Sequence, residues 1–116
     1  MKLGIVGSRT FDNYNLLEKE IFNQISLEAI ECVISGGARG ADTLAEKFAD
    51  KYNIPKMIYK ANWDKYGNIA GFLRNNDIVK NSDFIIAFWN GRSRGTQDTM
   101  TKAQASNKKL WIVRLD

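Results

Sequence analysis

The sequence predicts an α/β fold, a three-layer sandwich built on a five-stranded, mainly parallel sheet. Short runs of consecutive apolar residues, typical of strands buried on both faces, alternate along the chain with segments of helical periodicity. The turns after several of these runs are rich in glycine. The 116 residues suffice for one domain with one core, so we expect a single Rossmann-like domain over 1–116.

Each predicted strand is a short apolar run bounded by glycine or polar residues. The predicted strands span 2–7, 32–35, 56–60, 83–89 and 110–113. Each predicted helix has apolar residues three or four positions apart. The predicted helices span 14–27, 41–52, 70–80 and 96–107. Asp12 or Asn13 can cap the first helix, and Asn53-Ile54-Pro55 stops the second.

The remaining segment between the third strand and the third helix, 62–68, is polar and aromatic and contains Gly67, so we predict a loop. Strands that alternate with helices in this way favour a parallel sheet covered on both faces.

Composition excludes several kinds of chemistry. The chain has no histidine, which excludes histidine bases and histidine metal ligands, and one cysteine, which excludes a disulfide framework and a structural zinc site. We therefore expect no metal and no cofactor. The first apolar run is too short for a signal peptide or a membrane span, so we expect a cytoplasmic protein without membrane contact. The net charge of +4 favours anionic partners, although a solvated basic surface is the alternative interpretation.

Polar residues gather in three turns, each after a predicted strand: Gly7 to Phe11, Ser35 to Asp42, and Asn90 to Thr96. Ligands of open α/β sheets bind beyond the carboxyl ends of the strands, so we expect these turns to bound one pocket. Their glycines let backbone N–H groups and helix N-termini approach an anion. For the second turn, a purely structural role with Asp42 as a first-turn helix acid stays open. Neither a P-loop nor a dinucleotide fingerprint is present.

The same motifs, in order, resemble a known group of proteins. The residues that carry the resemblance are Gly7-Ser8-Arg9 with Phe11, Ser35 to Asp42, Ala70-Gly71 with Arg74-Asn75, and Ala87 to Gly91 with Ser93 and Gly95-Thr96. They are similar to the YspA/YpsA-related branch of the SLOG superfamily, which also includes the LOG phosphoribohydrolases and the DNA-processing protein DprA. The resemblance implies a Rossmann-like sheet and a nucleotide-related ligand.

LOG enzymes act on an N-glycosidic bond with an arginine and a Pro-Gly-Gly-x-Gly-Thr-x-x-Glu motif. Arg74 resembles that arginine, but Thr99 stands at the position of the glutamate. Asp98 precedes it by one residue and so points about 100° away around a helix. The candidate catalytic residues are therefore Arg74, Asp42 and Asp98, and we expect nucleoside monophosphates to be bound without efficient hydrolysis.

The expected ligand-binding residues are Gly7, Ser8, Arg9, Ser35, Gly36, Gly37, Arg39, Gly40, Asp42, Arg74, Asn75, Trp89, Asn90, Gly91, Ser93, Gly95 and Thr96. Trp89 is either a platform for a base or a core aromatic. Trp63 and Asp64, with Tyr66 nearby, either stack on and bond a base or belong to a loop that packs back on the core. Trp111 is expected in the core.

Three functions are compatible with these observations. The favoured one is a module that binds a nucleotide-derived small molecule, as a sensor, carrier or sequestering protein. The second is a LOG-like hydrolase of nucleoside 5′-monophosphates. The third is single-stranded nucleic-acid binding, which is less favoured because a long strand requires a basic groove with interleaved aromatics. A homo-oligomer is compatible with the resemblance.

Overall fold

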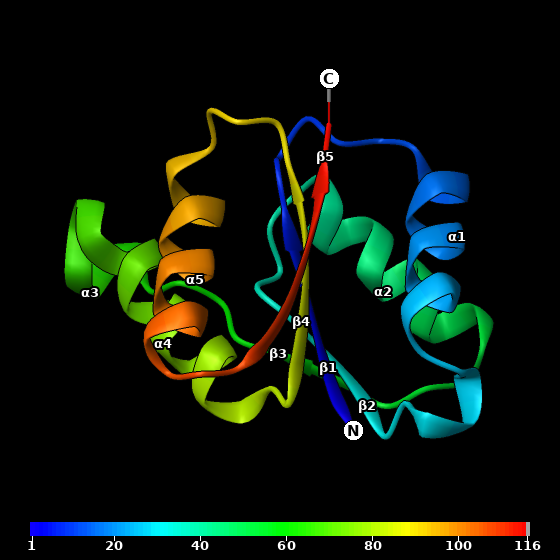
Figure 1. The fold of residues 1–116 in the computed structure, drawn as a ribbon. Coiled ribbons are helices and arrows are strands. Elements are labelled where there is room, and N and C mark those ends of the chain that lie inside the picture. Colours follow the sequence, from blue (N-terminus) through cyan, green and yellow to red (C-terminus); the bar gives the residue numbers. More distant parts are fainter. Residues whose placement is uncertain (116) are drawn as a thin grey trace.

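The computed structural model describes residues 1–115, which form a sheet with helices on both of its faces (Figure 1). The elements are β1 (Lys2–Gly7), α1 (Tyr14–Gln24), η1 (Leu27–Ala29), β2 (Cys32–Ser35), α2 (Ala41–Lys51), β3 (Lys56–Ile58), α3 (Trp63–Tyr66), η2 (Gly67–Ile69), α4 (Ala70–Asn81), β4 (Phe84–Trp89), α5 (Arg94–Ala105) and β5 (Lys109–Arg114).

The five strands lie in the order β3-β2-β1-β4-β5, and every pair is parallel. The predicted three-layer Rossmann-like fold is confirmed. β1 is the central strand, and chain connections run from it toward β3 on one side and from β4 toward β5 on the other. The carboxyl ends of β1 and β4 therefore form the point where the strand order reverses, where ligands bind in such sheets.

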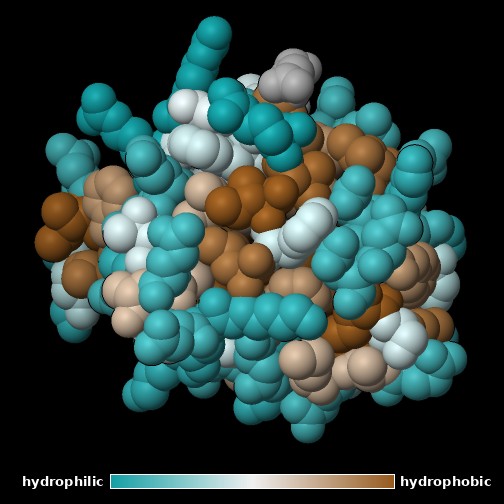
Figure 2. All heavy atoms as spheres, in the orientation of Figure 1, coloured by the Kyte–Doolittle hydropathy of each residue, from teal (hydrophilic) through white to brown (hydrophobic). Residues whose placement is uncertain are grey.

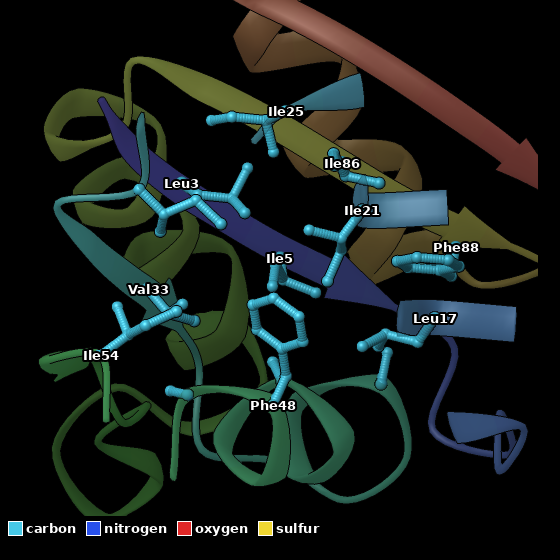
Figure 3. Close-up of a cluster of buried hydrophobic side chains, with 14 of the residues drawn as sticks. Leu3, Ile5, Leu17, Ile21, Ile25, Val33, Phe48, Ile54, Ile86 and Phe88 are labelled. Atoms are coloured by element: carbon cyan, nitrogen blue, oxygen red, sulfur yellow. The ribbon is translucent and has the colours of Figure 1, made fainter. Parts of the chain in front are cut away.

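Two apolar clusters fill the space on either side of the sheet. One lies beneath α1 and α2 and includes Leu3, Ile5, Leu17, Phe48 and Phe88 (Figure 3). The other lies beneath α4 and α5, on the opposite face. Alternate residues of each strand point to opposite faces, so the central strands must be apolar throughout, as the sequence predicts.

The predicted loop 62–68 is wrong in part, because it contains the helical turns α3 and η2. The Asn62 side chain accepts a hydrogen bond from the Lys65 N–H and so caps α3. The helix predicted over 14–27 ends at Gln24, since Ile25 adopts an extended conformation, and Asn13 is its cap. The remaining differences move the ends of elements by a few residues.

Trp111 is not a core residue, and that expectation is also wrong. β5 is an edge strand that pairs with β4 alone, and 43% of Trp111 and 38% of Ile112 remain exposed. Figure 2 shows hydrophobic atoms at the surface in the middle of the view, where β5 runs in Figure 1. Within residues 1–115, no helix has the length and apolar character needed to cross a membrane.

Candidate functional site

A pocket of about 330 Å³ opens at the carboxyl edge of the sheet, beside the ends of β1 and β4. Segments from both halves of the chain line it: the turn after β1, the start of α2, the segment α3–η2, the inner side of α4 and the first turn of α5. Its volume lies at the lower end of the ~300–1,000 Å³ range of small-molecule sites. The pocket therefore suits one small ligand.

The structure brings about half of the expected ligand-binding residues to this pocket. Those in its lining are Gly7, Arg9, Asp42, Arg74, Asn75, Ser93, Gly95 and Thr96. The others, which lie outside the lining, are Ser8, Ser35, Gly36, Gly37, Arg39, Gly40, Trp89, Asn90 and Gly91. The lining also contains residues that the sequence did not single out as binding residues: Val6, Ala38, Asn68, Gly71, Phe72, Ile78, Arg94 and Thr99.

Arg74 connects three segments at the floor of the pocket. Its Nη1 donates to the carbonyl oxygens of Gly36, at 2.5 Å, and Tyr59, at 3.3 Å, and its Nε donates to Asn75 Oδ1 at 3.0 Å. Within residues 1–115, Nη2 makes no hydrogen bond. Burial lowers the pKa of this guanidinium, and the nearby Asp42 carboxylate opposes that effect. The group still carries its charge at neutral pH and keeps free donors for a ligand.

Asp42, in the first turn of α2, is the acid of the pocket, and only 7% of it is exposed. Its Oδ2 accepts a hydrogen bond of 3.1 Å from the Ala38 N–H. Burial raises the pKa of Asp42, while this hydrogen bond and the Arg74 charge act in the opposite direction. The Ser35 hydroxyl is buried nearby but forms no hydrogen bond of good geometry. Asp42 is therefore a carboxyl group whose protonated form is favoured more than usual.

Thr99 and Asp98 point to different places, as the helical geometry requires. Thr99 is 1% exposed and lines the pocket, whereas Asp98 lies outside the lining. Asp98 Oδ2 accepts hydrogen bonds from Asn75 Nδ2 at 3.1 Å and from Lys102 Nζ at 2.7 Å. Asp98 thus positions Asn75, which itself lines the pocket.

The first turn of α5 offers free backbone donors to the pocket. Asn90 Oδ1 accepts from the N–H groups of Arg92 and Ser93, which folds the preceding loop back on itself. Ser93 then caps α5 through the N–H of Thr96. Among residues 1–115, nothing accepts from the N–H groups of Arg94 and Gly95. This exposed helix N-terminus carries the partial positive charge that attracts anions.

Ser8 has a structural role at this edge of the sheet. Its hydroxyl accepts a hydrogen bond from the Asn90 N–H, and its carbonyl oxygen accepts from the N–H groups of Phe11 and Ala41. Gly40 has a φ of +76°, and a Cβ there would collide with the Ser8 carbonyl oxygen. These contacts hold the three turns together beneath the pocket.

Trp89 and Trp63 lie in different surroundings. Trp89 donates from Nε1 to the Ser93 carbonyl oxygen at 3.1 Å, lies beside Arg114 and packs against the apolar cluster under α4 and α5. Trp63, on α3, lines the pocket with 49% of its surface exposed. Of the aromatic candidates for contact with a base, Trp63 lies in the pocket lining, whereas Trp89 and Tyr66 lie outside it.

Comparison with known proteins identifies the family of this chain. Residues 1–66 match the family described as "YspA, cpYpsA-related SLOG family", which is more than half of the chain. The chain belongs to this SLOG family. The resemblance seen in the sequence is thereby confirmed at the level of the family.

This SLOG protein is also similar to a phage protein. It is 40% identical over 78 residues to the "Gene 61 protein" of Mycobacterium phage D29, and the match covers 62% of each chain. The chain therefore spans less than two thirds of that relative, whose printed name states no activity. No solved structure matches the chain significantly.

Proposed function

We propose that this SLOG protein binds the phosphate of a nucleotide-derived small molecule in the pocket at the carboxyl edge of its sheet. The observation that carries the proposal is the convergence of three arginines, Arg9, Arg74 and Arg94, on the lining beside the unpaired N–H groups of α5. Fixed donors of this kind match the oxygens of a phosphate, and arginine provides two parallel donors.

The charge balance of the pocket supports an anionic ligand. Its lining contains three guanidinium groups and one carboxyl group, Asp42. The raised pKa of Asp42 lowers the cost of placing a second negative charge beside it. Family membership supports the nucleotide-related character of the ligand.

The proposal is tested by calorimetry with AMP, GMP, CMP and UMP on the wild type and two arginine variants. Arg9→Ala removes an arginine from the pocket lining, whereas Arg92→Ala removes an exposed arginine that lies outside the lining. We expect binding of at least one monophosphate, weakened at least ~10-fold by Arg9→Ala, since a charge-assisted hydrogen bond contributes about 1.5–3 kcal/mol. If both variants weaken binding equally, the affinity comes from general surface charge and not from the pocket. If the wild type binds none of the monophosphates, the proposal is contradicted.

The second candidate function is hydrolysis of the N-glycosidic bond, and the observation that favours it is the buried Asp42 carboxyl beside Arg74. Cleavage of that bond develops positive charge on the sugar, which a positioned carboxylate stabilises. Thr99 carries no charge and Asp98 lies outside the lining, so Asp42 is the acid available in the pocket.

Chromatography for free base after incubation with the four monophosphates separates the two functions. We expect no release at an enzymatic rate of ~1 s⁻¹ or above. If free base is released at such a rate, and Asp42→Asn abolishes the release without unfolding the protein, the protein is a hydrolase and not only a binding module.

A further inference from the structure

The pocket has a second, apolar end that phosphate recognition does not use. Trp63 from α3 and Phe72 from α4 line it, with 49% and 39% of their surfaces exposed. Large aromatic side chains left half uncovered inside a pocket gain free energy when a flat apolar ligand covers them.

Gly71 lies between this aromatic end of the pocket and its cationic end. A Cβ at Gly71 would stand 3.3 Å from Cη2 of Trp63 and 3.9 Å from Nη2 of Arg74. The indole ring and the unbonded nitrogen of the guanidinium therefore approach the same point on α4. A ligand that touches both carries an aromatic group and an anionic group a short distance apart.

Asn68 adds a polar contact at the same end. It lies in the segment between α3 and α4, lines the pocket and is exposed. Its amide offers both donors and an acceptor, which can pair with the edge of a base. The side-chain amide of Asn68 forms no hydrogen bond within the described part of the chain, so it is available to a ligand.

We propose that the α3–α4 end of the pocket is a base-binding subsite in which a nucleobase stacks on Trp63 while its phosphate lies at the arginines and the start of α5. This inference rests on the proposed function and narrows the ligand to a base-bearing mononucleotide rather than a sugar phosphate. The small volume of the pocket supports one nucleotide rather than a dinucleotide.

The test compares AMP with ribose 5-phosphate, which keeps the sugar and phosphate but lacks the base. Stacking on an aromatic side chain contributes a factor of roughly 5 to 150 in affinity per base. We therefore expect wild type to bind AMP at least ~10-fold more tightly than ribose 5-phosphate, measured by calorimetry.

Three variants test whether Trp63 is responsible for the difference in affinity between AMP and ribose 5-phosphate. Trp63→Leu is expected to weaken AMP binding at least ~10-fold and to leave ribose 5-phosphate binding unchanged, and Trp63→Phe is expected to keep most of the AMP affinity. Tyr66→Leu is the matched control, because Tyr66 is an exposed aromatic on the same helix that lies outside the lining. It is expected to change neither affinity.

Each remaining outcome contradicts the inference in a distinguishable way. If AMP and ribose 5-phosphate bind equally, or Trp63→Leu leaves AMP binding unchanged, the base subsite is wrong while phosphate binding stands. If neither ligand binds, the proposed function fails as well. If a single-stranded oligonucleotide binds more tightly than AMP, and both Trp63→Leu and Tyr66→Leu weaken it, the aromatic surface binds nucleic acid instead.

Discussion

Arg74 Nη1 donates a hydrogen bond of 2.5 Å to the carbonyl oxygen of Gly36, 38 positions earlier in the chain. One guanidinium thus holds α4 against the turn that follows β2, and it does so from inside the pocket. The residue that we expect to bind the ligand is also the residue that shapes the pocket wall.

Arg74→Ala is therefore expected to affect two properties. The free energy of unfolding should fall by about 1.5–3 kcal/mol, because a partly buried charge-assisted hydrogen bond is lost, and AMP affinity should fall at least ~10-fold. Urea unfolding and calorimetry measure the two effects. Arg39→Ala is the comparison, since Arg39 is exposed and lies outside the lining; a loss of affinity as large as that of Arg74→Ala would show that the turn Ser35 to Asp42 closes over the ligand.

Asp42 makes the stability of the protein depend on pH. Its pKa is raised in the folded chain above the ordinary value of 3.8, so the folded chain holds this proton more tightly than the unfolded chain. That contribution to stability is complete below the ordinary pKa and is lost as pH rises through the raised pKa. We expect the stability of wild type relative to Asp42→Asn to decrease from pH ~4 toward neutrality in urea unfolding. A difference that stays constant over this range, or that changes equally for the exposed Asp12→Asn control, would contradict it.

Replacement by alanine should have opposite effects on stability at two glycines of the pocket. A Cβ at Gly95 meets no atom within 4 Å, whereas a Cβ at Gly7 would stand 2.6 Å from the Phe88 carbonyl oxygen. Gly95→Ala should preserve the folded state or stabilise it by up to ~1 kcal/mol, because glycine is unfavourable in helices, yet weaken AMP binding since Gly95 lines the pocket. Gly7→Ala should lower the midpoint of thermal unfolding. Unchanged AMP affinity in Gly95→Ala would place the phosphate elsewhere.

Two helix caps provide a matched pair of substitutions. Asn13 caps α1 and Ser93 caps α5, each by a side-chain oxygen that accepts a backbone N–H. Replacement of either by alanine should lower the free energy of unfolding by about 1 kcal/mol. Ser93→Ala alone should also reduce AMP affinity, because α5 begins in the pocket and α1 does not. If the two variants bind AMP with equal affinity, the start of α5 does not contribute to AMP binding.

The fold was predictable because buried strands and amphipathic helices leave different periodicities in the sequence. The gathering of the polar turns was predictable too, since parallel strands end at one edge and those turns follow β1, β2 and β4. The short helix α3 was missed because four residues are too few to show a helical period, and the Asn62 cap was the available signal.

Other features depend on spatial arrangement that a single sequence does not encode locally. The apolar run of β5 does not reveal that the strand lies at an edge, which is why Trp111 is exposed. Phe72 and Arg94 line the pocket because α4 and α5 both border it, and Asn68 lines it because η2 leads into α4. Arg39 and Arg74 were indistinguishable as charges in the sequence, and the difference in their burial follows from the packing of α4.

The central position of β1 has a consequence for folding kinetics. Leu3 pairs with Val33 on one side and with Phe84 on the other, so the second pairing must close a loop of about 80 residues. Contacts that distant in sequence form slowly and raise the contact order of the chain. A polypeptide that stops at residue 66 contains Arg9 and Asp42 but lacks α4, α5 and β4, and so has one wall of the pocket. A ligand that needs both walls binds the completed fold alone, stabilises it by mass action, and is expected to slow its unfolding.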